Sequence, residues 1–322
     1  MIVEHQDCFV CRAPAWFETL SGPAAGELHA RLSFSFAHEG WQGIPHGGTA
    51  MTALLELADL LCLRERGSGL EYPLRSKWRF GDSVRIGDEM ELTARFREDE
   101  SRLQLAMRRP ESEKIYLQGE LELGVAPAGA DFEPPPARLL APARPHQPLE
   151  IYDNCFVCGC SRKVPGLERR FFRTAAGLFE PPLVLVRFGH RPDQERRLAE
   201  NFQQYTGRLH PGVLAALLDE LCGWSGVLSG ELYGFTVRFE LTINALPRIT
   251  DELLGLAPQP PVRGRGERCF YYPHGMLLQH SESGFGDVVA AASGQWLARP
   301  ELAQQFRETH VKEDLSGILF TG

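Results

Sequence analysis

The chain contains two long, continuously apolar segments, and each is followed by shorter segments in which polar and apolar residues alternate. The apolar segments span residues 49–63 and 213–228. Both are longer than a usual β-strand, and their apolar residues would surround a helix on all sides. We therefore predict two helices, each buried on most faces and wrapped by other structure.

The alternating segments predict antiparallel strands separated by turn-forming residues. In the first half of the chain, these segments span residues 75–80, 89–96, 103–108 and 114–123. In the second half, they span residues 234–243, 267–272, 276–280 and 287–297. The fold class is therefore predicted to be α+β, with a central helix followed by a four-strand meander in each half.

Two landmarks recur in the same order, which indicates an internal duplication. Cys-Phe-Val-Cys occurs at 8–11 and again at 155–158, and the turns His46-Gly47-Gly48 and His210-Pro211-Gly212 precede the two apolar segments. Two matches in one order make chance a poor explanation.

Proline-rich composition between the repeats favours extended chain and marks the boundary between two modules. We expect a first module at residues 1–127, a linker at 128–150, a second module at 151–300 and a C-terminal tail at 301–322. The second module is longer between its two landmarks, and its polar stretch at 191–204 is expected to hold the insertion.

Composition narrows the function to small-molecule chemistry. A net charge of −8 and a pI near 5.7 disfavour nucleic acid and anionic membrane surfaces as partners. The N-terminus lacks the basic and apolar regions of a leader, and no run is long enough to span a membrane, so a cytoplasmic location is expected. The eight cysteines are then free thiols or metal ligands rather than a disulfide framework.

These residues resemble the hotdog-fold thioesterases of the phenylacetyl-CoA type. That family combines a Cys-Phe-x-Cys opening, a Gly-x-x-His-Gly-Gly turn, found here at 43–48, and Leu-Leu-Asp-Glu on the next helix, found here at 217–220. The resemblance covers roughly residues 5–125 and 152–298. It implies two tandem hotdog modules, paired as an intrachain pseudodimer, that hydrolyse an acyl-CoA or aroyl-CoA with no cofactor beyond the CoA of the substrate.

Thioester hydrolysis requires donors for the charge on the carbonyl oxygen and a carboxylate as nucleophile or general base. In the family, the turn of one subunit supplies the backbone N–H groups and the helix of the other supplies the carboxylate. The resemblance therefore implies a site that pairs Gly47 and Gly48 with Asp219. His46 either shapes this turn by hydrogen bonding or acts as a base, and the structural role is favoured.

The second site implied by the pairing lacks both functions. It would combine Pro211 and Gly212 with Leu55, but proline has no N–H and leucine has no proton chemistry. The neighbouring Glu56 points about 100° away around the helix and is a weak substitute. We expect this site to be degenerate.

Several features also have ordinary structural explanations. Glycines before a helix are common caps, and an Asp-Glu pair usually lies on a solvated face, although Asp219 stands in an apolar run where an unpaired carboxylate is costly. Trp41 and Trp224 either line an acyl pocket or pack in the core.

The two Cys-x-x-Cys pairs could hold zinc if they converged, but free thiols are favoured and no metal is expected. A basic cluster could meet CoA phosphates or be a solvated loop: Arg263, Arg265 and Arg268.

Three functions remain to be separated. Hydrolysis of an acyl-CoA leads, while a hydratase on the same fold is disfavoured because neither Asp219 nor His46 has the expected Asp–His companion five residues away. A non-catalytic protein that binds an acyl thioester or lipid is the alternative from another class. A homodimer of the whole chain is expected, because hotdog proteins commonly stack further.

Overall fold

The computed structural model describes residues 8–12, 15–97, 101–127, 147–149, 152–160, 162–174, 177–189, 200–204, 207–229, 233–265, 268–281 and 284–298. The tail at 301–322, nearly all of the predicted linker and most of the predicted insertion lie outside these residues. No helix in the described part is long and apolar enough to cross a membrane.

The two predicted helices are present, and each begins at a capping histidine. Helix α1 spans Gly47–Arg66 and helix α3 spans Pro211–Val227. His46 and His210 are the N-caps, and each ring accepts a hydrogen bond from the backbone amide two residues later. Helix α1 is capped at its C-terminus by Gly67, whose φ of 72° suits glycine. The helices start two residues before the apolar runs because capping, rather than hydrophobicity, fixes their first turn.

The N-terminal half contributes six strands to a large antiparallel sheet. They are β1 (Thr19–Ala24), β2 (Glu27–Ser33), β5 (Leu74–Phe80), β6 (Glu89–Phe96), β7 (Arg102–Arg108) and β8 (Ile115–Leu123). A short helix, η2 (Phe36–His38), and a two-stranded ribbon lead into α1, the ribbon being formed by β3 (Glu39–Trp41) and β4 (Ile44–Pro45).

The C-terminal half follows the same plan with an added hairpin. Its strands are β9 (Gln147–Leu149), β10 (Phe171–Arg173), β11 (Leu183–Phe188), β12 (Gly234–Ile243), β13 (Leu253–Pro258), β14 (Val262–Arg265), β15 (Arg268–Tyr271), β16 (His274–Ser281) and β17 (Gly284–Ala298). The added hairpin is β14–β15, and β15 also pairs with β17.

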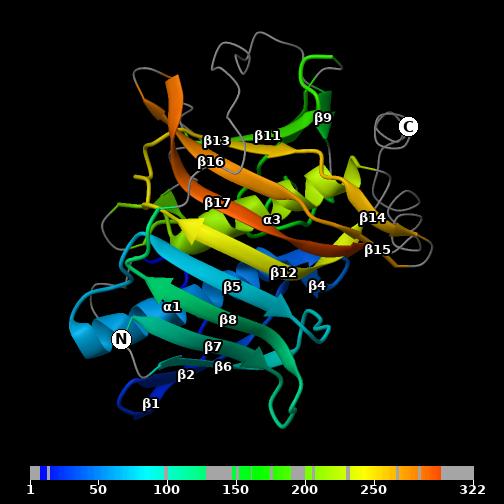
Figure 1. Cartoon of the computed structure of the whole chain (residues 1–322). Helices are drawn as coiled ribbons and strands as arrows, with labels where there is room; N and C mark the ends of the chain where they lie inside the picture. The colour runs from blue at the N-terminus through cyan, green and yellow to red at the C-terminus, as the bar shows by residue number, and fades with distance from the viewer. Residues whose placement is uncertain are drawn as a thin grey trace.

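The two halves share one continuous sheet. Its strand order is β1-β2-β6-β7-β8-β5-β12-β17-β16-β13-β11-β10-β9, with β5 and β12 paired antiparallel at the centre. Outward from this centre, the strands of the first half (β5, β8, β7, β6, β2, β1) follow the same order along the chain as those of the second half (β12, β17, β16, β13, β11, β10). Figure 1 shows the sheet passing without a break from one half to the other. The prediction that the two sheets join edge to edge is confirmed.

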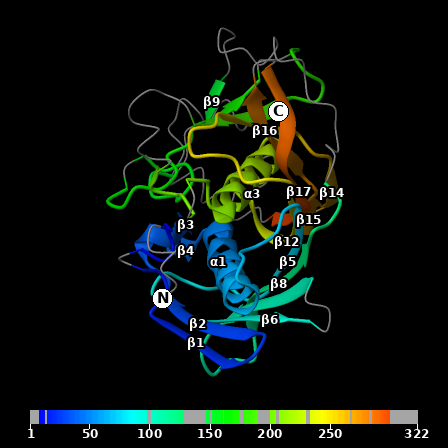
Figure 2. The same cartoon turned by 90° about the vertical axis from the view of Figure 1, so that its left-hand side faces the viewer.

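Both helices cover the same face of this sheet, and Figure 2 shows them one above the other beside its strands. Their N-terminal turns pack directly together: a Cβ added to Gly48 would meet Ala216 at 2.4 Å, and one added to Gly212 would meet the Thr52 side chain at 2.2 Å. Glycine at these positions therefore permits the close crossing that places the N-terminus of each helix beside the side chains of the other.

The predicted meander of the second half needs a correction. Strand β13, with all six residues buried, was missed, because a strand buried on both faces lacks alternation. The predicted strand at 267–272 is β15, which belongs to the added hairpin rather than to the central meander. Strands β1, β2, β10 and β11 also lie outside the segments that alternation selects.

Candidate active site

A cavity of about 600 Å³ lies between the two halves, at the N-terminus of α1. Its walls come from the turn before α1, from α3 and from the ends of the central strands β5 and β12. The volume falls within the roughly 300–1,000 Å³ that small-molecule sites occupy. Three of the four predicted site residues line it directly: His46, Gly47 and Asp219.

His46 links the two halves through both ring nitrogens. Its Nδ1 accepts a hydrogen bond from the Gly48 amide at 2.8 Å, and its Nε2 lies 3.1 Å from Glu220 Oε2 on α3. The bond from Gly48 requires an unprotonated Nδ1, so it can form only while the ring is neutral, with its proton on Nε2 and directed at Glu220. The capping role that the sequence favoured for His46 thus depends on a carboxylate from the other half.

Glu220 is held by several donors around its carboxylate. Trp224 Nε1 donates to Oε1 at 3.1 Å, and Cys155 Sγ lies 3.7 Å from the same oxygen. Burial raises the pKa of Glu220, but the hydrogen bonds from His46, Cys158 and Trp224 lower it more, and the net shift is downward. Glu220 is therefore ionised and serves as a fixed anchor for the His46 ring.

Asp219 lies against the first turn of α1. Its Oδ1 accepts a hydrogen bond from Thr236 Oγ1 at 2.9 Å, and its Oδ2 lies 3.5 Å from His46 Nδ1. A Cβ added to Gly47 would stand 2.8 Å from the same Oδ2, so glycine leaves the room that the carboxylate occupies. The structure therefore brings the predicted aspartate of one half to the predicted turn of the other.

The two glycine amides differ in what they can donate. The Gly48 amide is engaged by the His46 ring, whereas the Gly47 amide has no hydrogen-bond partner in the part of the chain that the structure describes. It is one of the first amides of α1, which have no intrahelical acceptor and carry the positive end of the helix dipole. Gly47 is thus the donor that remains open to a ligand.

The two neighbouring carboxylates on α3 have different proton affinities. Burial raises the pKa of Asp219, and the charge of His46 and the hydrogen bond from Thr236 offset this only in part. Burial lowers the pKa of His46, but its bond to Glu220 and the nearby negative charges raise it to about 9. A second proton on this ring would sit on Nδ1, facing Asp219, and would displace the cap bond from Gly48. In that protonated form, the His46 ring would pair with the Asp219 carboxylate 3.5 Å away.

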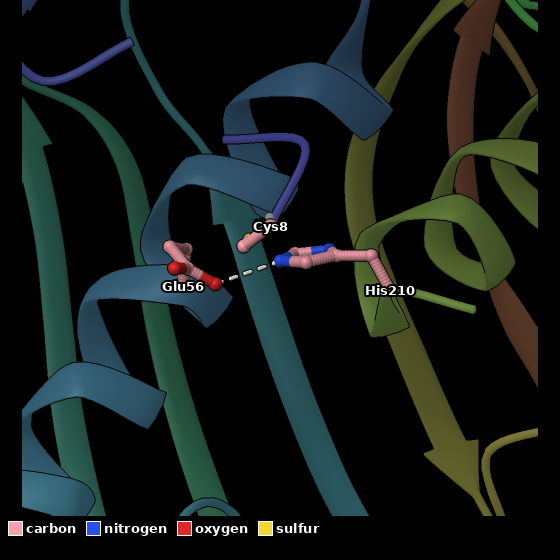
Figure 3. A group of neighbouring side chains, drawn as sticks. All are labelled: Cys8, Glu56 and His210. Carbon is pink, nitrogen blue, oxygen red and sulfur yellow. Dashed lines mark hydrogen bonds and ion pairs between the residues drawn. The ribbon is translucent and has the colours of Figure 1, made fainter. Parts of the chain in front are cut away.

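A second cluster repeats the His–Glu arrangement at the start of α3. Gly212 donates to His210 Nδ1 at 3.0 Å, and His210 Nε2 lies 2.9 Å from Glu56 Oε2 on α1. Cys11 Sγ donates to the other oxygen of Glu56 at 2.8 Å. Figure 3 shows Glu56 and His210 directed at each other with Cys8 beside them. Each capping histidine is thus anchored by a glutamate from the opposite half.

Both clusters contain the residue types that bind metals, so their fit to an ion can be tested. Ligand atoms of Cys8, Glu56 and His210 lie within 4.8 Å of one another, as do those of His46, Cys155 and Glu220. A metal on Nε2 would need the lone pair there, but Nδ1 already accepts an amide hydrogen and the neutral ring carries its proton on Nε2. Hydrogen bonding to Cys8 and burial also raise the pKa of the Cys11 thiol. The observed bonds fit a protonated network better than a metal site.

The second cluster lacks the reactive groups of the first. Leu55, fully buried, occupies the place of Asp219, and Pro211 occupies the place of Gly47 at the first position of α3. Glu56 turns to His210 and does not replace the missing aspartate. The histidine caps are therefore duplicated, while the carboxylate and the open amide occur once.

Sequence reasoning missed the glutamates and the role of the cysteines. Glu56 and Glu220 were visible only as neighbours of the aspartate positions, and their partners stand 154 and 174 residues away. The duplicated Glu at the same place in both helices was the available signal. The Cys-x-x-Cys pairs do not converge on each other; each lies beside its own glutamate.

The two tryptophans singled out in the sequence lie at the cavity, and the basic cluster is described only in part. Trp41 and Trp224 are both buried and both line the cavity, so the core and pocket roles are not exclusive. Arg263 is exposed, with its guanidinium 5.5 Å from the ring of Tyr272. The side chains of Arg265 and Arg268 lie outside the described residues.

The chain is similar in structure to several solved proteins. A provisionally assigned thioesterase from Novosphingobium aromaticivorans DSM 12444 superposes with a TM-score of 0.55 at 14% identity, over 87% of this chain and 98% of that one. The dehydratase domain of a mycocerosic acid synthase-like polyketide synthase gives 0.52 at 13% identity, over 87% and 93%. An acyl-CoA thioesterase II from Mycobacterium marinum gives 0.50 at 14% identity, over 87% and 94%.

No protein-family model matches the chain, and no curated protein matches it. At these identities, the structural likeness shows the fold, and the chain has a hotdog fold of the α+β class. Because the similar structures include a hydrolase and a dehydratase, the reaction must be argued from the site itself.

Proposed function

We propose that the chain hydrolyses an acyl-CoA or aroyl-CoA thioester at one asymmetric site, the cavity between the two halves. In this proposal, residues 1–127 and 151–300 form two hotdog modules that act together as an intrachain pseudodimer. The first module supplies the turn and the second supplies the carboxylate. Only one of the two sites that such a pair could form carries the reactive groups.

The observation that carries the proposal is the contact between Asp219 and the first turn of α1. Gly47, whose amide has no partner among the described residues, and Asp219 both line the cavity of about 600 Å³, and a Cβ added to Gly47 would stand 2.8 Å from Asp219 Oδ2. An amide at a helix N-terminus stabilises the negative charge that forms on the carbonyl oxygen of a thioester. The carboxylate beside it stands where a nucleophile or base for the carbonyl carbon is needed.

The reaction can be written with its atoms balanced. The carbonyl oxygen of the thioester accepts from Gly47, and Asp219 either removes a proton from an attacking water or attacks the carbonyl carbon itself. In the second route, attack displaces the CoA thiolate and forms an anhydride, and a water then cleaves the anhydride, restores Asp219 and leaves its proton to the thiolate. In the water route, the C–S bond breaks as the tetrahedral intermediate collapses, and the proton held by Asp219 passes to the leaving thiolate. The products are a carboxylic acid and free CoA.

Neighbouring groups hold Asp219 ready for this role. Thr236 fixes Oδ1, which leaves Oδ2 facing Gly47 and His46. The raised pKa of Asp219 makes it a stronger base than an exposed aspartate, while the ionised Glu220 keeps His46 in place. Glu220 and His46 are therefore proposed to position the turn, and Asp219 to react.

The cavity walls favour an apolar acyl group. Much of the lining is aromatic: Trp41, Phe80, Tyr116, Trp224, Phe235 and Trp296. Flat rings bury large apolar area and stack with one another and with ligands. The Mycobacterium marinum neighbour is named an acyl-CoA thioesterase II, which agrees with this proposal for the present chain.

Release of free CoA from a panel of short, long and aromatic acyl-CoAs tests the proposal. A thiol-reactive dye follows the product, and turnover should disappear in Asp219→Asn. A protein that only binds thioesters would raise its melting temperature with the same compounds while releasing no thiol. That result would replace hydrolysis by the binding function.

A further inference from the structure

A second cavity lies between segments of the two halves. It has a volume of about 370 Å³, and its described lining includes Asp59, Tyr72, Gln204, Arg208 and Asn244. Neither Leu55 nor Pro211 is among its lining residues. This second cavity is therefore separate from the places where catalytic groups would have stood.

The second cavity is the counterpart of the first, as equivalent backbone hydrogen bonds show. Ile86 donates to the Gly43 carbonyl at 2.8 Å beside the first cavity, and Ile249 donates to the Gly207 carbonyl at 3.0 Å beside the second. In each half, the bond joins the segment before the helix to the segment after the central strand, β5 or β12. The two bonds therefore show which positions of the two halves correspond.

The same alignment identifies which residues replace one another. Gly40 and Gln204 each precede their capping histidine by six residues, and Ile44 and Arg208 each precede it by two. On the helices, Gly223 of α3 corresponds to Asp59 of α1. All six of these residues line one cavity or the other. Where the first cavity has two glycines and an isoleucine, the second has a carboxamide, a carboxylate and a guanidinium.

This replacement gives the second cavity two opposite charges, one buried and one exposed. Asp59 is 1% exposed, and its Oδ1 accepts from the Leu70 amide at 2.6 Å. Arg208 is exposed, and its Nη1 donates to the Leu246 carbonyl at 2.6 Å. A buried carboxylate favours a cationic or donor group, and an exposed guanidinium favours an anion.

Gln204 adds an independent sign that a ligand is accommodated. Its side chain is 4% exposed, and within the described residues its Nε2 has no hydrogen-bond partner. A buried amide donor without an acceptor is costly, so a residue of this kind beside a cavity is expected to meet an acceptor from a ligand. Gln204 and Arg208 together would then bind the same anionic group.

We propose that the second cavity is a binding site for a small zwitterion of the α-amino acid type. The ammonium group meets the buried Asp59, and the carboxylate meets Gln204 and Arg208. Duplication would thus have left one cavity for chemistry and turned the other to recognition of a different, polar molecule. This proposal does not depend on the hydrolase activity, because the residues that carry it are not those of the first cavity.

Calorimetric titration of the intact chain with each of the twenty common free amino acids tests the proposal. At least one should bind saturably, with one site per chain, and neither its decarboxylated amine nor its deaminated acid should bind comparably. Asp59→Asn and Arg208→Gln should each weaken binding roughly tenfold or more, as expected for the loss of a charge-assisted hydrogen bond. Arg208 is exposed, so its variant keeps the test valid even if Asp59→Asn fails to fold.

Asp219→Asn serves as the matched control from the first cavity and should leave amino acid binding unchanged. The proposal is overturned if no amino acid binds at millimolar concentration, or if binding survives both Asp59→Asn and Arg208→Gln. Loss of binding in Asp219→Asn would place the ligand in the first cavity and would also overturn it. Binding of free CoA or pantetheine that depends on Asp59 would identify a retained substrate pocket instead.

Discussion

The first and second cavities are built on the same backbone and differ in the side chains that reach them. In both, a histidine caps the adjoining helix and is anchored by a glutamate from the opposite half. The first cavity also has Asp219 and the open Gly47 amide. The residues that correspond to these two are Leu55 on α1 and Pro211 on α3. The comparison separates what the fold needs, which is duplicated, from what the proposed chemistry needs, which is not.

The duplicated parts hold the two helices together at their N-terminal turns. A capping bond and an anchored ring fix the helix start whether or not a reaction takes place there. The unduplicated parts are costly to the fold: Asp219 is a buried carboxylate whose pKa is raised by that burial. A buried carboxylate is expected to be kept where a function requires it, as proposed at Asp219, and to be lost where no function does, as at Leu55.

The largest effect is expected from Asp219→Asn. This change removes the proposed nucleophile or base and keeps the shape and the hydrogen bond from Thr236, so kcat should fall roughly 10²–10⁴-fold while KM changes little. Steady-state CoA release measures both constants. Full activity in this variant would show that the difference between the two cavities is not catalytic.

Replacing Gly47 by proline, the residue at the matching position of α3, should reduce kcat less than Asp219→Asn does, but still strongly. Gly47→Pro removes the open amide at a helix position where proline is already tolerated in the other half. We expect a loss of roughly 10²–10³-fold in kcat, as for removal of one oxyanion donor. Gly47→Ala is the control, because it adds the Cβ near Asp219 and keeps the amide. Equal losses in both variants would assign the effect to crowding rather than to the donor.

Thr236→Val tests how Asp219 is held. The hydroxyl lowers the pKa of Asp219, so removing it should raise that pKa further and reduce kcat/KM about tenfold on the acidic limb of the pH profile. In the proposed mechanism only ionised Asp219 reacts, so activity should rise with pH through its pKa, and the acidic limb of the profile should lie at higher pH in the variant. A profile whose acidic limb does not move would mean that another group controls it.

Much of this architecture was predictable from the sequence. The repeat, both buried helices and most central strands follow from hydrophobic periodicity, and the family resemblance leads to the pairing of Asp219 with Gly47. Strand β13 was not predictable, because burial on both faces removes its alternation. The roles of Glu56 and Glu220 depend on partners in the opposite half, which periodicity within one segment cannot identify.

The second cavity was also beyond sequence reasoning. The losses at Leu55 and Pro211 predict a site without chemistry, but they do not show whether space remains. That space depends on Gln204, Arg208 and Asn244, which line a cavity only after segments from α1, β12 and the turn before α3 come together. None of these residues belongs to a recognisable motif.

A smaller effect concerns stability. A raised pKa means that folding favours protonated Asp219, so its contribution to stability is present below the ordinary value of 3.8 and is lost as pH rises through the raised value. Asp219→Asn should therefore stabilise the protein at neutral pH, by about 1.4 kcal/mol for each unit of pKa elevation. Chemical denaturation at pH 7 and pH 4 measures this. A gain as large at pH 4 as at pH 7 would contradict the assignment to ionisation.

The smallest effect is expected at the matched position of the other half. Leu55→Met conserves volume in the core and should change kcat by less than about twofold, at a stability cost below about 1.5 kcal/mol. Turnover and denaturation of the same preparation measure both. A loss of activity comparable to that of Asp219→Asn would mean that both halves contribute reactive sites.

A crystal structure with a non-cleavable substrate analogue tests the central claim most directly. In the analogue, a methylene group separates the acyl carbonyl from the CoA sulfur, so the carbonyl is kept while hydrolysis is prevented. The account predicts the carbonyl oxygen within about 2.7–3.2 Å of the Gly47 amide nitrogen and the Asp219 carboxylate beside the carbonyl carbon, with no analogue beside Leu55. A carbonyl bound away from Gly47, or bound equally beside Pro211 and Leu55, would contradict it.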